Sequence, residues 1–492
     1  MKKLLIILTT LISMFSFAQT TISGKVIDMK NQPIIGANVY LEGTYDGATT
    51  DDKGDFSFQS TETGTQVLII SYLSYETKTV AGDVSTLQNL QIKLREDVNT
   101  LDAVVISAGT FEANDNSKVS VLSSLDVVTT ASAVGDFVGA LQTLPGTSTV
   151  AEDGRLFVRG GEADETQIFI DGIRVFTPFS PTPNNLPTRG RYSPFLFDGI
   201  TFSTGGYSAE YGNALSSVLL LNTINEPDQN KTEIGIMSVG GRVGHTKKWE
   251  KTSLSVNATY INLAPYIALY PDRNDWKKPF EGAQGEAVFR QKFDTGMLKF
   301  YAAFDTTSFD LTQDDINNPE GVRFKLSNRN FYSNASYRGV LGNNWSLESG
   351  LSYTLGITDV SVNNSTDIEN NENSFHLKAK LRKRFSSRFK LSFGLEHFST
   401  DFEEGIGSNQ SSNQYGFINN NSGAFVESDL IFSKNLAIKA GLRADNYQLS
   451  DKINISPRVS LAYKTSKNGQ LSVAYGDFFQ NVNAGLLKFD TS

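Results

Sequence analysis

Apolar and polar residues alternate over most of the chain after residue 227. In residues 254–260 (LSVNATY) and 436–447 (LAIKAGLRADNY), every second residue is apolar and the residues between them are polar or small. The pattern returns at 391–398 (LSFGLEHF) and 470–478 (QLSVAYGDF). A period of two predicts β-strands that each have one apolar and one wet face, and we expect about twelve of them in this region.

The connections between these strands alternate in length. Short turns are expected at 294–296, 342–344, 386–388 and 433–435, and long polar loops at 263–284, 308–321, 358–374 and 400–416. Outer-membrane barrels have tight turns on one side and long loops on the other, whereas a soluble sandwich has no reason to alternate in this way. The pattern therefore predicts an antiparallel transmembrane β-barrel in residues 227–492.

The first part of the chain has a different pattern of apolar and polar residues. Lys2 and Lys3, an apolar run and the small-x-small site Ser16-Phe17-Ala18 predict a signal peptide at residues 1–18, and hence export. In residues 19–97, apolar and polar residues alternate in short segments that are separated by turn-forming residues, and no helical period is present. This pattern predicts a small β-sandwich.

Two further regions separate the sandwich from the barrel. Residues 98–117 form a polar linker that contains one isolated strand-former, LDAVVISAGT (101–110). Residues 118–226 are mixed: SLDVVTT (124–130) is strand-like, and residues 136–144 suit a short helix. The Asp171-Gly172 pair between QIFI and IRVF predicts a two-residue hairpin. We expect an α+β domain here.

Composition and charge exclude several functions. The 492 residues carry a formal net charge of -9, which argues against a nucleic-acid partner, and contain no cysteine for disulfides, thiolate chemistry or metal ligation. The histidines, His245, His376 and His397, are expected at the surface or in the lumen. Acidic loops such as 401–407 lack the ordered ligand spacing of a Ca²⁺ site. We expect no enzyme, catalytic residue, metal site or cofactor.

Several segments resemble known families. GKVID, PIIGANVYLEGT, GATTDDKGDFSF and ISYLSYETKTV resemble the carboxypeptidase regulatory-like domain, a non-catalytic transthyretin-like sandwich. LQTLPG, FVRGG, IDGIRVFTP and ITFSTGGYSAEYGNALSSVLLLNT are similar to the plug domain of TonB-dependent outer-membrane receptors, and residues 456–480 resemble a mid-barrel strand pair of these receptors. The expected fold is mainly β: a transthyretin-like sandwich, an α+β plug and an antiparallel transmembrane barrel.

The resemblance implies energy-coupled uptake of a scarce solute such as a ferric siderophore, glycan or peptide. It implies an outer-membrane location with the N-terminal sandwich in the periplasm. The expected partners are outer-membrane lipid, the solute and the C-terminal domain of TonB with its energising complex, and a surface lipoprotein is a further candidate. An adhesion or matrix-interaction protein on the same architecture is the alternative.

The isolated strand-former resembles the TonB box, which would add an extended strand to a sheet edge of TonB. The alternative is a last strand of the sandwich, although LQIKLRE already closes that domain. The residues expected in the box are Leu101, Asp102, Ala103, Val104, Val105, Ile106, Ser107 and Ala108.

Residues 177–194 are rich in proline and cannot lie within a central sheet. In the resembling family, loops of the plug contribute to the solute site, so Phe179, Arg189, Arg191 and Tyr192 are candidate solute contacts. The alternative, which we slightly favour, is that this loop wedges against the barrel wall and its arginines pair with lumen carboxylates.

Residues 375–384 (FHLKAKLRKR) place basic side chains on one face, which would line the lumen. They would either attract an anionic solute or pair with plug carboxylates such as Glu162, Asp164 and Glu165, and we favour pairing.

A barrel that encloses a plug has roughly 22 strands, so about twelve would leave it incomplete. We therefore expect the sequence to lack the C-terminal part of the barrel, and no closed barrel within these residues.

Overall fold

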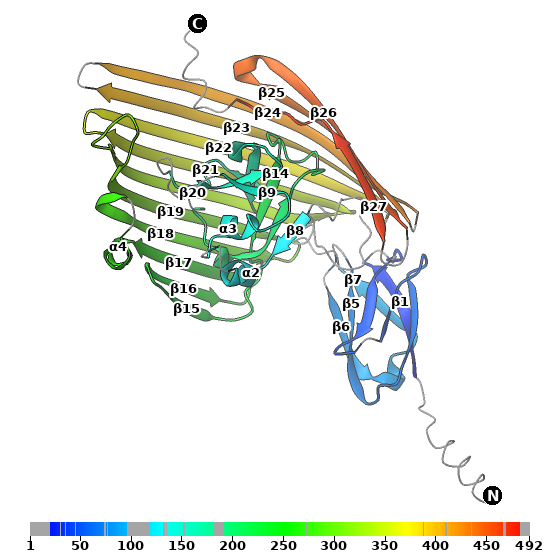
Figure 1. Cartoon of the computed structure of the whole chain (residues 1–492). Helices are drawn as coiled ribbons and strands as arrows, with labels where there is room; N and C mark the ends of the chain where they lie inside the picture. The colour runs from blue at the N-terminus through cyan, green and yellow to red at the C-terminus, as the bar shows by residue number, and fades with distance from the viewer. Residues whose placement is uncertain are drawn as a thin grey trace, which may run out of the picture. The chain divides into compact units, whose positions relative to one another are not determined.

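The computed structural model describes residues 20–482, apart from 30, 35, 45, 73–74, 76, 96–118, 131–132, 134, 151–152, 182–189, 272–273, 387, 409–410, 434 and 466–468. The predicted signal peptide, the predicted TonB box and Arg189 therefore lie outside the described residues. The chain divides into two compact units, residues 1–110 and 111–492, which are described separately (Figure 1). Within the described residues, no helix combines the length and apolarity that a membrane crossing requires.

The first unit is the predicted β-sandwich. One sheet has the order β3-β2-β5-β6, and the other has the order β4-β1-β7. Alternate side chains of both sheets form one apolar core, which includes Ile22, Val39, Leu68 and Ile92. The strands are β1 (Thr20–Asp28), β2 (Asn38–Leu41), β3 (Gly47–Thr49), β4 (Asp55–Ser60), β5 (Thr65–Ser71), β6 (Lys78–Asp83) and β7 (Leu90–Leu94).

The second unit begins with an α+β domain, called the inner domain below (residues 119–226). Its main sheet has the order β12-β11-β14-β13-β8, and β9 pairs with β10. The elements are β8 (Val119–Leu122), α2 (Ser124–Thr129), α3 (Phe137–Leu141), β9 (Thr147–Val150), β10 (Asp153–Val158), β11 (Thr166–Ile170), β12 (Ile173–Val175), β13 (Phe197–Ser203) and β14 (Ser217–Thr223), with the 3₁₀ turns η4 (Ala163–Glu165) and η5 (Pro194–Leu196).

Two local predictions for the inner domain have different outcomes. The Asp171-Gly172 hairpin is confirmed: β11 and β12 are antiparallel, and both turn residues have positive φ, 50° and 83°. The strand expected at 124–130 is wrong, because these residues form α2. Ser123 and Asp126 make a reciprocal capping box, which satisfies the first free N–H groups of a helix.

The rest of the unit is a 13-stranded antiparallel sheet in which the strands follow one another in chain order from β15 to β27 (Figure 1). The described strands form an open sheet with β15 and β27 at its edges, as expected. They are β15 (Lys231–Met237), β16 (Gly240–Lys248), β17 (Thr252–Asn262), β18 (Asp275–Phe293), β19 (Gly296–Gln313), β20 (Val322–Gly342), β21 (Trp345–Val362), β22 (Thr366–Ser386), β23 (Phe389–Ser408), β24 (Ser412–Ser433), β25 (Leu436–Tyr447), β26 (Lys452–Lys464) and β27 (Gln470–Gly476).

Short connections follow β18, β20, β22 and β24, as predicted. We call the end of the strands where these connections lie the turn end. The opposite end, where β19 is joined to β20, β21 to β22 and β23 to β24, is called the hairpin end. The predicted loops at 358–374 and 400–416 are largely wrong, because β21–β24 continue through most of both segments. Their Asn, Ser, Thr and Glu residues resemble a loop in composition. Cross-strand hydrogen bonds satisfy the backbone there, so both faces of the strands can be polar.

The two faces of the sheet differ. One face carries an exposed apolar band toward the turn end, in which paired residues such as Phe289 with Phe300 and Leu351 with Leu377 are 38–48% exposed. Such a band suits contact with lipid. The other face, called the lumen face, packs against the inner domain, and Val288, Tyr301 and Tyr332 join its core (Figure 1).

Candidate functional site between the inner domain and the sheet

The β11–β12 hairpin tip is fixed to the lumen face by a buried ion pair. The Asp171 carboxylate lies 3.0 Å from the Lys299 ammonium on β19 and also accepts hydrogen bonds from the backbone N–H and hydroxyl of Thr223. Lys299 donates a further bond to the Thr223 carbonyl, and Lys378 donates to the carbonyl of Gly172. Asp171 and Lys299 are 4% and 6% exposed, so this contact is shielded from water.

The second contact is residues 207–213 (YSAEYGN), part of the segment that most resembles a plug. The Glu210 carboxylate pairs with two lysines of β22: Lys378, and Lys380 at 2.7 Å. Strand β24 adds Glu427, which accepts bonds from the Ser208 hydroxyl (2.9 Å) and the Ala209 N–H (2.8 Å).

Two buried arginines of the sheet complete this contact. Arg443 donates to the carbonyls of Ala209 and Glu210 while its other nitrogens bond Glu396 and Asp445. Arg458 donates to the carbonyls of Ser208 and Tyr211. A Cβ at Gly212 would lie 2.2 Å from the Arg443 guanidinium, which explains a glycine at this position of the motif.

The third contact contains two of the predicted solute residues. Arg191 lies 2.5 Å from the Asp305 carboxylate on β19 and 3.0 Å from Asn328 Oδ1 on β20. Tyr192 packs against Tyr301 and Tyr332, with ring centroids 6.1 and 5.8 Å apart. Arg191 and Tyr192 are 6% and 3% exposed, so the structure places them between the inner domain and the sheet, and a role in solute binding stays a prediction.

The fourth contact joins β12 to strands β21–β23. The backbone N–H of Arg174 donates to His376 Nδ1 at 3.0 Å, and its carbonyl accepts from the Ser352 hydroxyl. Its guanidinium lies 4.9 Å from the Phe176 ring centroid and 5.5 Å from that of Phe398. Burial lowers the pKa of Arg174 to about 10, so it keeps its charge at neutral pH. His376 lies on the lumen face, whereas His245 is exposed at the surface.

The basic strip of β22 faces the inner domain as expected, but the structure assigns it a different carboxylate. Lys378 and Lys380 pair with Glu210, a carboxylate of residues 207–213 that was not among the predicted partners Glu162, Asp164 and Glu165. Asp164 lies 3.8 Å from Arg155 within the inner domain. Phe179 is partly buried beside the inner-domain core.

Sequence reasoning missed Asp171, Glu210, Lys299 and Arg443 as contact residues. The available signal was an acidic residue close to a glycine in two segments of the inner domain, Asp171-Gly172 and Glu210-Tyr211-Gly212, together with basic residues on the polar faces of the strands. Among the described residues, no cluster of three or more His, Asp or Glu side chains could hold a metal ion. The four contacts together can hold the inner domain in place on the lumen face.

Three family models match the chain. They are the CarboxypepD_reg-like domain over residues 22–106, the TonB-dependent Receptor Plug Domain over residues 113–218, and the TonB dependent receptor-like beta-barrel over residues 269–488. Among curated proteins, TonB-dependent receptor SusC of Bacteroides thetaiotaomicron is 26% identical over 184 residues, which are 35% of this chain and 18% of that protein.

Solved structures share the fold over about three quarters of the chain. The ferric enterobactin receptor PfeA from Pseudomonas aeruginosa has a TM-score of 0.57 at 12% identity over 76% of this chain and 64% of that chain. The siderophore receptor PirA from Pseudomonas aeruginosa has a TM-score of 0.52 at 15% identity over 75% of this chain and 63% of that chain. The chain thus spans less than two thirds of the length of these relatives, and at such identities the likeness shows the fold alone.

Proposed function

Because the chain belongs to the TonB-dependent receptors and carries an N-terminal CarboxypepD_reg-like domain, we propose that it is an outer-membrane receptor for the energy-coupled uptake of a scarce solute. The observation that carries the proposal is the docking of the inner domain on the lumen face by buried charges. Asp171, Arg191 and Glu210 each meet a sheet residue of opposite charge away from water.

Such docking opposes the first step of opening. When the partners of a buried ion pair separate before water reaches them, each is an uncompensated buried charge, at a cost of up to about 3–5 kcal/mol. Three such pairs would have to separate, so spontaneous opening would be slow. A receptor built in this way needs external work to open, and the proposed source is TonB with its energising complex in the inner membrane.

The proposed orientation follows from the two ends of the sheet. The turn end faces the periplasm together with the N-terminal unit, the apolar band contacts outer-membrane lipid, and the hairpin end lies outside the cell. Strands β19–β24 have 18 to 22 residues, whereas crossing a bilayer takes about 9–11, so their hairpin ends would extend beyond the lipid. A solute, or a surface lipoprotein that delivers it, would arrive at this end.

The proposed point of force is Leu101–Ala108, the predicted TonB box. Val104, Val105 and Ile106 favour an extended backbone, which reduces the ordering cost of adding a strand to a sheet edge of TonB. The box precedes the inner domain directly in the chain, so a pull on it would act on the inner domain before the sheet.

The box can be tested without knowing the solute. In the complete receptor, Val105→Pro removes a backbone donor from the added strand, so binding of the TonB C-terminal domain should fall at least about tenfold while membrane insertion is unchanged. The measurement is retention of the TonB domain by immobilised receptor in detergent. Val105→Ile, which keeps the N–H and the branched side chain, is the control and should bind normally. Equal binding by all three proteins would remove the box assignment and favour an adhesion protein.

A further inference from the structure

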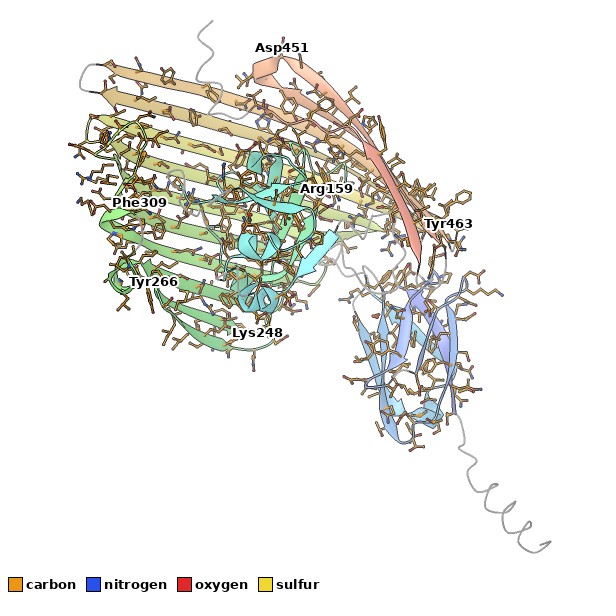
Figure 2. All side chains as sticks on the ribbon, viewed as in Figure 1. Arg159, Lys248, Tyr266, Phe309, Asp451 and Tyr463 are labelled. Atoms are coloured by element: carbon orange, nitrogen blue, oxygen red, sulfur yellow. The ribbon has the colours of Figure 1, made fainter. Side chains whose placement is uncertain are left out.

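The last strand of the described sheet, β27, is short, with 7 residues against 13 in its neighbour β26. Arg458 of β26 pairs with Gly476 and faces the inner domain, whereas Tyr463, labelled in Figure 2, lies on the opposite face of β26 and is 45% exposed. Beyond this pair, the N–H of Asp477 donates to the Pro457 carbonyl at 3.0 Å. A hydrogen-bonded pair of antiparallel strands exchanges two such bonds, but Pro457 has no N–H to donate. The ladder therefore ends here, and the chain leaves the sheet.

Residues 477–482, called the strap below, turn from the sheet onto the inner domain. The Phe478 ring packs against an apolar cluster of the inner domain, with its centroid 4.8 Å from that of Tyr207. The Arg458 guanidinium lies 4.4 Å from the Phe478 centroid and 5.2 Å from the Tyr207 centroid. Phe478 therefore covers the arginine that binds two carbonyls of residues 207–213, and it shields these charge-assisted bonds from water.

The strap also bonds the inner domain at two polar positions. The backbone N–H of Asn481 donates to Asn213 Oδ1 at 2.6 Å, which fixes the last residue of the 207–213 segment. The Gln480 side chain donates to the Asp164 carbonyl at 2.7 Å. Because Phe478 packs on the first residue of the same segment, the strap holds both of its ends, while Glu427 and Lys380 of the sheet hold the residues between them.

We propose that the strap is a latch on the inner domain, so that residues 207–213 leave the lumen face only after the strap has lifted. As long as the strap holds both ends of this segment, a bond to the sheet that breaks has its partner still in place and re-forms. Lifting the strap exposes Arg458 to water, which then competes for this side chain. The strap thus sets the rate at which the contact opens. The inference depends neither on the identity of the solute nor on the TonB box.

The test measures hydrogen–deuterium exchange of the backbone amides of residues 207–213 in the complete receptor, purified in detergent. The N–H of Ala209 donates to the Glu427 carboxylate, so its exchange reports that the segment has left the sheet. Phe478→Ala should speed this exchange about tenfold, because the strap then loses its apolar contact. Phe479→Ala is the control: it is the same substitution one residue later, where the side chain is 37% exposed, and the exchange should not change.

A reversible cross-link provides a second measurement. The chain contains no cysteine, and Asn481 already bonds Asn213, so Asn213→Cys with Asn481→Cys creates a single pair that joins the strap to the inner domain. Oxidation should form the disulfide and slow the exchange of residues 207–213 by at least about tenfold, and reduction should reverse the effect. The control is Ala440→Cys with Val459→Cys, which joins directly paired, exposed residues of β25 and β26, and its oxidation should not change the exchange.

Each other outcome overturns the inference. It is wrong if the two phenylalanine variants exchange at equal rates, if the disulfide does not form, or if its oxidation leaves the exchange unchanged. Residues 190–192 serve as the internal reference, because Arg191 is bonded to Asp305 and Asn328 of the sheet in the third contact. If Phe478→Ala speeds exchange there as much as in residues 207–213, the ring stabilises the whole inner domain and is not part of a latch.

Discussion

At the scale of single residues, the sequence predicts the type of contact but not the partner. The alternation in 375–384 places Lys378 and Lys380 on the lumen face, and electrostatics requires a carboxylate opposite them. The choice of Glu210 depends on how the inner domain folds and docks, because Glu210 is 168 positions away from Lys378 in the chain. Local patterns contain no information on such a pairing. The same holds for Arg191, whose partner Asp305 belongs to a strand 114 residues away.

Glu210→Gln should weaken the docking of the inner domain. The amide fits the same space but leaves two buried ammonium groups with less negative charge, at a loss of stability of up to about 3–5 kcal/mol. The loss should be nearer the lower value, because Lys380 also lies 3.2 Å from Glu348. The measurement is denaturant unfolding of the receptor in detergent, with limited proteolysis of the inner domain. Glu162→Gln, at an exposed inner-domain position, is the control and should have no measurable effect.

At the scale of elements, the alternation of apolar and polar residues predicted where the strands lie. Residue composition did not predict where they end. The alternation and the short turns are local properties, so the sheet and its turn end could be predicted. The hairpin ends of β21–β24 could not, because polar residues on both faces look like a loop until cross-strand pairing is known. Helix α2 was missed for a different reason: two adjacent valines favour a strand, whereas its capping box overrides that preference.

Two substitutions on one face of β22 test which part of the strand meets lipid. Leu377 lies in the apolar band and is 48% exposed, whereas Glu369 is an exposed residue on the same face nearer the hairpin end. Leu377→Arg should destabilise the inserted receptor by about 2–4 kcal/mol if it lies near the bilayer midplane. Glu369→Arg should change stability by less than about 0.5 kcal/mol. Folding into lipid vesicles, followed by electrophoretic mobility and denaturant titration, measures both. Equal effects would place the lipid boundary elsewhere.

At the scale of the whole molecule, the two units differ in what stabilises them. The second unit holds its inner domain against the sheet by buried ion pairs and by an apolar core that sheet residues share. The first unit is held by an apolar core formed from both of its own sheets. A domain with its own core does not need a membrane or the other unit to fold, so the proposed sandwich of residues 19–97 should be an independent folding unit.

Residues 19–97 expressed alone should therefore unfold in one cooperative transition on heating. The core side chain Leu68 is 0% exposed on the central strand β5, so Leu68→Ala removes buried methyl groups and leaves a cavity. We expect it to lower the free energy of unfolding by about 2–5 kcal/mol. Met29→Ala is the control, since Met29 is 59% exposed, and it should stay within about 0.5 kcal/mol of the parent domain. Circular dichroism during urea and thermal unfolding provides the measurement. A gradual transition in the parent domain, or equal effects of the two substitutions, would mean that the sandwich depends on the rest of the chain for its stability.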